Sequence, residues 1–200
     1  MGPRHAARRR RAADRETRVM KSHGNDDDHA LRNALTGLRH GDFSRLEPLF
    51  TVESGDAGSR PRILEWLDQG RFDAHPAELA EALTCACFLG CVTVAGRLLL
   101  KDVDPASGKR TGMDALHWAA NRGQLEAVRL LLKHKAPLET RSRFGGTVLG
   151  TAVWSALNEP KPNHALILEE VLKAGAKTDD VEYPSGNAQV DQILERFGAR

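Results

Sequence analysis

The most reactive side chains in this sequence belong to three closely spaced cysteines. Cys85, Cys87 and Cys91 form a Cys-x-Cys-x3-Cys pattern, and thiolates serve proteins as zinc ligands and as nucleophiles. All three fall in one predicted helix, on which Cys85 points about 160° away from Cys87. One helix cannot present all three thiols to one ion, and the sequence designates no base for a catalytic thiol. We therefore expect reduced, packed cysteines and no metal or cofactor, with an enzyme or redox role of these thiols as an alternative.

Histidines and carboxylates do not form a second reactive cluster. His40, His134 and His164 fall at the ends of predicted helices, and a cationic side chain at a helix C-terminus is favourable without any further function. Pairs such as Glu169–Glu170 and Asp179–Asp180 fall on predicted surface or turn positions. The sequence contains no G-x-S-x-G, H-E-x-x-H, P-loop or G-x-G-x-x-G motif. We therefore expect no catalytic residue and a protein that is not an enzyme.

The elements that position these residues repeat along the chain. Within residues 112–138, a glycine separates two apolar faces at helical spacing: Leu116, Ala119 and Ala120, then Gly123, then Val128, Leu131 and Leu132. This pattern is typical of a helix-turn-helix unit. Equivalent residues recur 33 positions earlier and 33 positions later: Leu83, Ala86, Gly90, Ala95 and Leu98, and Leu149 and Ala152. The spacing predicts an array of stacked helix pairs.

One stretch of this array carries a family motif. Asp114 to Ala120 reads D-A-L-H-W-A-A and resembles the T-P-L-H-x-A motif of ankyrin repeats, whose period is about 33 residues. The resemblance implies an all-α fold, an ankyrin-repeat α-solenoid of stacked helix-turn-helix units with short β-turn fingers. His117 stands where the family has its histidine, which implies a structural hydrogen bond in the turn before the helix rather than a ligand role.

The resemblance divides the chain into three parts. Residues 1–28 are expected to form a disordered basic N-terminal tail, and residues 29–78 an irregular N-terminal capping repeat region. Residues 79–200 then contain the ankyrin repeats and a truncated C-terminal capping repeat, since terminal repeats must present one polar side to water. In the last full repeat, seven extra residues are expected at 157–163, where two prolines cannot continue a helix.

The resemblance also implies where a partner would bind. Ankyrin repeats commonly bind proteins with their finger tips and with exposed positions of the first helix in each repeat. The matching helix positions are Phe88, Leu89, Asn121, Arg122, Trp154 and Ser155. The matching finger positions are Lys109, Arg110, Thr111, Met113, Arg141, Arg143, Phe144 and Gly146.

Aromatic residues and arginines, which dominate this set, are enriched at binding hot spots. The sequence therefore predicts a non-enzymatic protein–protein interaction scaffold, acting as a monomer on a protein partner. The arginines of the fingers favour a partner with an acidic or carboxylate-bearing segment. The alternative for Phe88 and Trp154 is packing against the irregular N-terminal region or the inserted loop, and Trp118 is expected to be packed.

Charge is distributed unevenly along the chain. Residues 1–21 carry eight Lys or Arg and two Asp or Glu, while the remainder carries 21 basic and 25 acidic residues. A basic arm can bind phosphates, so the alternative function is association with nucleic acid or an anionic surface. No aromatic residue is interleaved in the arm to stack on bases, which argues against nucleic acid. No apolar run reaches the roughly 18 residues of a membrane span and no secretory signal is present, so we expect a cytoplasmic protein with no membrane contact.

Overall fold

The computed structural model describes residues 26–52 and 60–200. It divides into two units, one ending at Thr36 and the other formed by Gly37–Arg200. The described residues of the first unit are helical, within a helix over 26–40. Residues 26–28, which the sequence grouped with the tail, lie in this helix, because the carbonyl groups of one helical turn accept hydrogen bonds from the next. The rest of the expected tail lies outside the described residues.

The described part of the second unit is helical throughout, with no strand among its residues. After residue 40 its elements are η1 (Phe43–Leu46), α2 (Glu47–Phe50), α3 (Arg62–Asp68), α4 (Pro76–Leu89), α5 (Val92–Leu99), α6 (Ala115–Asn121), α7 (Leu125–Lys133), α8 (Val148–Asn158), α9 (His164–Lys173) and α10 (Ala188–Arg196). The starts of α6 and α8 lie 33 residues apart, and so do those of α5 and α7. The all-α fold and its 33-residue repeat are confirmed.

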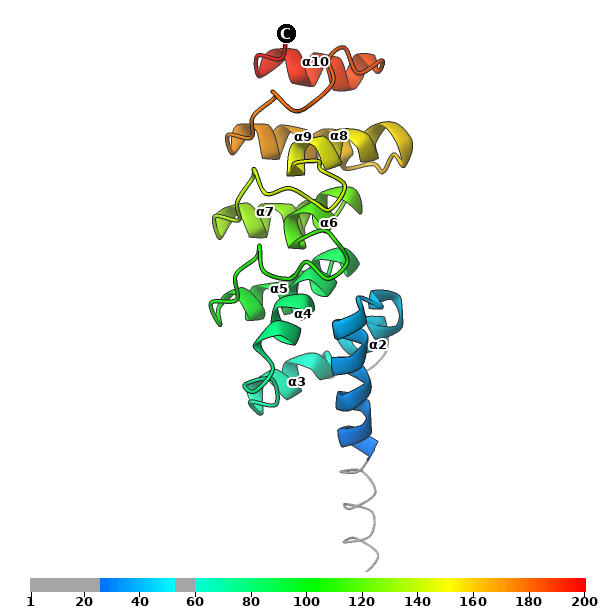
Figure 1. Ribbon diagram of the computed structural model, residues 1–200, viewed down its shortest axis with the longest axis vertical. Coiled ribbons are helices and arrows are strands. Elements are labelled where there is room, and N and C mark those ends of the chain that lie inside the picture. Colours follow the sequence, from blue (N-terminus) through cyan, green and yellow to red (C-terminus); the bar gives the residue numbers. More distant parts are fainter. Residues whose placement is uncertain (1–25, 53–59) are drawn as a thin grey trace, which may run out of the picture. The chain divides into compact units, whose positions relative to one another are not determined.

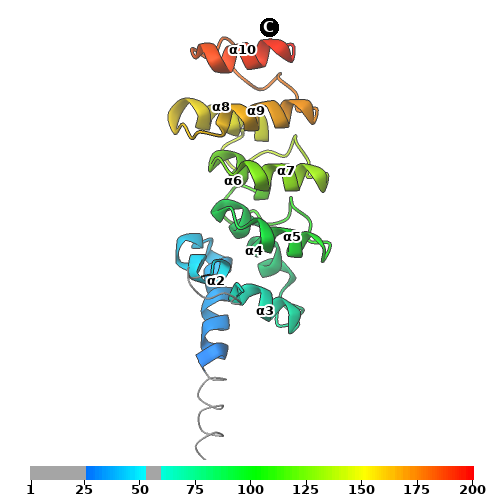
Figure 2. The same ribbon diagram turned by 180° about the vertical axis from the view of Figure 1, so that it is seen from behind.

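These helices stack in two rows. Helices α4, α6 and α8 contact one another in sequence and form the first-helix row, while α3, α5, α7 and α9 form the second-helix row in the same way. Each first helix also packs on its partner, α4 on α5, α6 on α7 and α8 on α9, and α10 covers α9. Figures 1 and 2 show the pairs as successive layers from opposite sides. The predicted array of stacked helix pairs is therefore present.

Fully buried leucines form the core between the layers. Leu83, Leu116 and Leu149 lie on the first-helix row, and Leu98 and Leu131 lie on the second-helix row, each with 0 or 1% of its surface exposed. All five came from the repeating apolar pattern. A helix pair has bare apolar faces that only the next pair can bury, which is why the array is stable as a stack.

Capping residues set the helix ends. Asp114 and Thr147 cap α6 and α8 by accepting hydrogen bonds from the backbone N–H groups three residues on, as short polar side chains do at this position. Helix α4 ends at Gly90, whose left-handed backbone (φ 74°) suits a residue without Cβ. Helix α4 begins with Pro76, whose missing N–H costs nothing in the first turn, so α4 is longer than α6.

Two hydrogen-bonded turns project between the repeats, and we call residues 108–113 the first finger and residues 141–146 the second finger. The backbone N–H of Arg143 donates to the carbonyl of Gly112 (2.7 Å), which joins the two fingers. A Cβ on Gly112 would lie 2.0 Å from Cδ of Arg143, so this contact requires glycine. The fingers consist of turns, as the ankyrin resemblance implied.

The extra residues of the last full repeat lie between α8 and α9. Helix α8 continues to Asn158, so the first two residues of the expected insertion extend the helix, and a loop follows at 159–163. His164, the first residue of α9, is buried and donates through Nε2 to the carbonyl of Asn121 (3.2 Å). Asn163 donates to the carbonyl of Gly123 (3.2 Å). The loop is therefore connected to the helix turn of the preceding repeat.

The region before α4 contributes to both rows. Element η1 contacts α4, α2 contacts η1 and α3, and α3 contacts α5. This agrees with the interpretation of residues 63–70 as the second helix of a repeat. We keep the division into an irregular cap at 29–78 and repeats with a truncated cap at 79–200 as a proposal. Among the described residues, no helix has both the length and the apolar content needed to cross a membrane.

Candidate functional site

The cysteines do not form a reactive centre in the described structure. Cys85 and Cys87 are buried in α4, whereas Cys91 follows Gly90 and is the N-cap of α5. The expectation of three cysteines on one helix is therefore wrong, because Gly90 ends α4. Burial raises the pKa of all three thiols, which favours the less nucleophilic protonated form. Within residues 26–52 and 60–200, no three His, Cys, Asp or Glu residues are grouped as a metal site.

Asp114 connects α6 with the following repeat. Its Oδ1 accepts hydrogen bonds from the backbone N–H of His117 (3.1 Å) and from ring Nδ1 of His117 (2.8 Å), and its Oδ2 accepts from Oγ1 of Thr140 (2.7 Å). Burial by itself raises the pKa of Asp114, but the hydrogen bonds from His117 and Thr140 and the charge of His117 outweigh it and lower that pKa. The buried carboxylate is thus fully paired.

His117 positions the second finger. Its ring is fully buried, and Nε2 lies 3.2 Å from the carbonyl oxygen of Gly146. Since the carbonyl of Gly146 and the carboxylate of Asp114 can only accept, both hydrogen bonds form when both ring nitrogens carry a proton. His117 is structural, as expected, but it lies in the first turn of α6 rather than before it, because Asp114 is the N-cap.

The same two positions support the first finger one repeat earlier. Glu81 lies 33 residues before Asp114, and its Oε1 accepts from the backbone N–H of Arg110 (3.0 Å). Oγ1 of Thr84, 33 residues before His117, donates to the carbonyl of Gly108 (2.8 Å). Burial raises the pKa of Glu81, against the effect of the Arg110 hydrogen bond. In both repeats, therefore, side chains of the first helix determine where a finger lies.

A pocket of about 510 Å³ lies beside the second finger. Its lining residues come from the second finger, from α8 and from the neighbouring repeats: Met113, Asn121, Ser142, Phe144, Gly146, Gly150, Thr151, Trp154 and Asp180. Phe144 is 72% exposed and Trp154 is 51% exposed. Pockets of roughly 300–1,000 Å³ with mostly apolar walls accommodate ligands, so this pocket has room for side chains of a partner.

Cationic side chains surround this pocket. The guanidinium of Arg143 lies over the ring of Phe144, 4.9 Å from its centroid. Arg141 donates to Asp180 (2.6 Å) and to the carbonyl of Gly145 (2.8 Å). Asp180, the one carboxylate that lines the pocket, is thereby neutralised, and Arg143 lies beside the pocket with no ion pair to any described residue.

An aromatic cluster lies farther along the first-helix row. The ring of Phe88 meets Phe43 (5.8 Å between centroids) and Trp118 (5.0 Å), both edge to face. Arg122 covers Phe88 at 4.8 Å from its centroid. Nε1 of Trp118 donates to Oγ1 of Thr111 (2.7 Å) in the first finger. Phe88 thus packs against the N-terminal region, the alternative left open by the sequence, and Trp118 is packed as expected.

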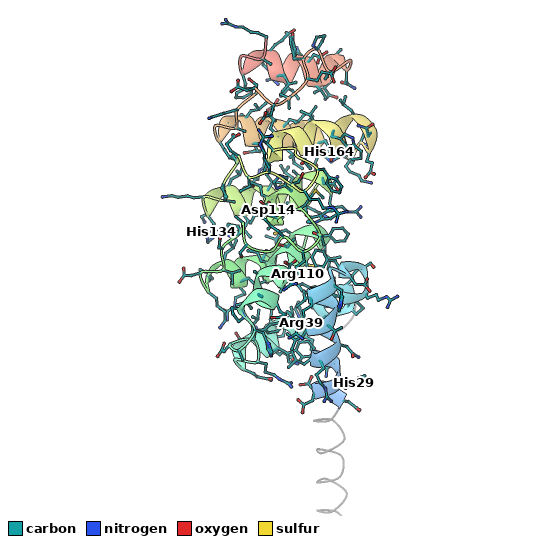
Figure 3. All side chains as sticks on the ribbon, viewed as in Figure 1. His29, Arg39, Arg110, Asp114, His134 and His164 are labelled. Atoms are coloured by element: carbon teal, nitrogen blue, oxygen red, sulfur yellow. The ribbon has the colours of Figure 1, made fainter. Side chains whose placement is uncertain are left out.

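The predicted contact residues fall into three groups. Met113, Asn121, Phe144 and Trp154 come together in the pocket. Five cations are exposed on the fingers or at the end of α6: Lys109, Arg110, Arg122, Arg141 and Arg143. Phe88 and Leu89 are half-buried, in the last turn of α4. In Figure 3, Arg110 and Asp114 lie at neighbouring levels of the stack, whereas His134 lies at the end of α7.

Two of these residues are not exposed as expected. Ser155 is fully buried because its hydroxyl donates to the carbonyl of Thr151 (2.8 Å) and accepts from Nδ2 of Asn121 (2.9 Å). Met113 is 7% exposed, at the wall of the pocket. Ser155 therefore orients Asn121 and does not itself face a partner.

Four pocket residues were not predicted: Ser142, Gly150, Thr151 and Asp180. Asp180 lies after α9, in the position of a further finger. The insertion before α9 shifts the register there, so the 33-residue spacing does not identify it. Gly150 and Thr151 form the first turn of α8 and were assigned to the helix without a surface role.

Stacked helix pairs with a 33-residue period and projecting fingers define a helical repeat protein with a concave pocket. The model of ankyrin repeats in three copies matches residues 57–142 and 82–180. This chain belongs to the ankyrin repeat family, whose members are typically protein–protein interaction modules and are generally non-catalytic. The matched region includes α3 and ends before α10.

Proposed function

We propose that this protein is a non-enzymatic, monomeric binding module that places a partner protein on its fingers and first-helix row. The proposed contact residues are Phe88, Leu89, Lys109, Arg110, Met113, Asn121, Arg122, Arg141, Arg143, Phe144 and Trp154. The proposal includes the cytoplasmic location expected from the sequence. One observation carries it: two large aromatic side chains, Phe144 and Trp154, remain exposed at a pocket although the adjacent core is closely packed.

Exposed apolar surface beside a pocket is characteristic of binding sites, and aromatic anchors commonly dominate their affinity. The pocket walls are also fixed before any partner arrives. The second finger is joined to the first by the Arg143–Gly112 hydrogen bond and to α6 by His117 and Gly146. A preformed surface loses little conformational entropy on binding, which favours affinity.

The test removes the aromatic pair. Phe144→Ala with Trp154→Ala is compared with the wild type in a pull-down from lysate of the source cells. The matched control is Leu100→Ala with Leu166→Ala, since these leucines are also exposed (71% and 46%) but lie at the end of α5 and on α9. Circular dichroism first establishes that all three proteins are equally helical.

We expect a protein that is captured by the wild type and the control but not by the aromatic variant. Titration calorimetry with that purified protein should then show an affinity at least about tenfold lower for the aromatic variant. If all three proteins capture the same set, the proposed surface is wrong.

A further inference from the structure

The finger side of the second unit carries cations that are not used within the described structure. Lys109 and Arg110 are exposed, and Arg122 and Arg143 lie over aromatic rings. None of the four forms an ion pair with any residue in 26–52 or 60–200. A guanidinium over a ring keeps its charge and its hydrogen-bond donors for a further acceptor.

Carboxylates are scarce on the same side. Asp180 is the one acidic residue that lines the pocket, and Arg141 already neutralises it. The carboxylates of Glu81 and Asp114 are buried beneath the fingers, where they accept hydrogen bonds from protein groups. The exposed charge around the pocket is therefore positive, even though the chain after residue 21 carries more acidic than basic residues.

The positive charges and the pocket are arranged along one direction. Arg110 belongs to the first finger and Arg143 to the second, and the bond between Arg143 and Gly112 makes the two fingers neighbours. The pocket follows on the far side of Phe144, toward Trp154. A ligand that contacts both fingers and the pocket must cross from one repeat to the next, which an extended chain does more readily than a compact group.

We propose, building on the proposed function, that the partner contributes an extended acidic segment with one large apolar side chain. The apolar side chain enters the pocket between Phe144 and Trp154. Asp or Glu residues next to it pair with Arg143 and Arg110, on the side away from Asp180. Arginine suits this role because its planar fork binds a carboxylate through two parallel hydrogen bonds.

Nucleic acid is also negatively charged, but the pocket favours a polypeptide. Its walls offer Met113, Phe144 and Trp154 as apolar contacts, and a carboxylate, Asp180, lies at its edge. A phosphate at this edge would be repelled, whereas an apolar side chain is not. Charge complementarity at the fingers together with an apolar pocket is thus best matched by an acidic peptide with an apolar anchor.

The experiment is a selection from a library of random displayed peptides against the full chain. Peptides of about ten residues are suitable because they span roughly 33–36 Å when extended. The charge variant is Arg110→Glu with Arg143→Glu, and a milder version changes both to Ala. The control is Lys101→Glu with Lys133→Glu, which changes the net charge equally at exposed lysines near the ends of α5 and α7.

We expect the wild type and the control to enrich peptides in which Asp or Glu flanks Leu, Ile, Met, Phe or Trp. These peptides should bind the charge variants at least about tenfold more weakly, as measured by fluorescence anisotropy. Circular dichroism and thermal melting establish that each variant is folded. Displacement of the peptides by a thymidine oligonucleotide would instead assign the surface to nucleic acid and overturn the proposal.

The remaining outcomes separate this inference from the proposed function. Peptides that require Phe144 and Trp154 but show no acidic preference would overturn the acidic segment and leave the binding surface intact. Peptides that bind the Phe144→Ala, Trp154→Ala variant undiminished would contradict both. If no peptide is enriched, a short acidic segment is not the ligand, and the pull-down alone decides the proposed function.

Discussion

The two helix rows of the second unit use their charged residues differently. On the second-helix row, ion pairs join successive repeats. Arg129 of α7 meets Glu170 of α9 (3.0 Å), and Arg196 of α10 meets Glu169 of α9 (2.7 Å). The charges of these outer helices are thus largely satisfied by neighbouring repeats, and little of their electrostatic potential remains for a partner.

On the finger side, repeats are joined mainly by buried hydrogen bonds instead. His117 bonds to Gly146, and Thr84 to Gly108. The exposed cations on this side lie over rings, as Arg143 does over Phe144. The comparison shows that the fingers are positioned without their surface charges, which therefore remain free to act on something outside the chain.

The largest effect expected is the loss of core packing on the second-helix row. Leu131 is fully buried in α7, which contacts both α5 and α9. Leu131→Ala should reduce the free energy of unfolding by about 2–5 kcal/mol, because it leaves a cavity between layers. Phe144→Ala, at an exposed side chain, should change it by less than about 0.5 kcal/mol.

Urea denaturation of both variants beside the wild type measures the two values. Equal losses would mean that Phe144 is a structural residue and that the two sides do not differ. A change at Leu131 within experimental error would contradict the stacking of α7 between α5 and α9.

A smaller effect should depend on pH rather than on salt. His164 donates to Asn121, and its Nδ1 accepts from the backbone N–H of Lys161 (3.0 Å), so the ring is neutral in this contact. Burial lowers the pKa of His164 below its ordinary value of 6.5, and the charge of Lys161 acts in the same direction. The contact therefore contributes its full stability above the unfolded-state pKa and loses it as the pH falls through the folded-state pKa.

His164→Gln keeps a donor for Asn121 but cannot titrate. At neutral pH it should cost about 1 kcal/mol, because the N–H of Lys161 loses its acceptor. The difference in unfolding free energy between wild type and variant should shrink as the pH is lowered from about 7.5 to about 5.5. Curves that stay parallel over this range would show that His164 is not buried as the neutral ring.

The regular part of the fold was predictable because its signal recurs. Leu83, Leu116 and Leu149 repeat at one spacing, and each must be buried by the next helix pair. The end of α4 was less predictable. Cys91 was assigned to that helix because an apolar period continues through Gly90, but the left-handed backbone at Gly90 ends it.

The candidate site was predictable only in part. Phe144 and Trp154 follow from the family register, which places them on a finger and on an exposed helix position. The role of Phe88 depends on Phe43, which lies in a region without regular spacing. Asp180 reaches the pocket from beyond the insertion, where the register no longer indicates which residues are neighbours.

The smallest effect tests the comparison most directly, because it asks whether exposed charges stabilise one side and not the other. Arg129→Ala removes ion pairs with Glu126 (2.8 Å) and Glu170. It should lower the melting temperature slightly at low salt, and the difference should vanish at about 1 M NaCl, where the Debye length is about 3 Å. Arg143→Ala removes no ion pair to a described residue, so its melting temperature relative to the wild type should not depend on salt. If the effect of Arg143→Ala does depend on salt, a carboxylate of the chain itself neutralises this arginine, and the finger side is not reserved for a partner.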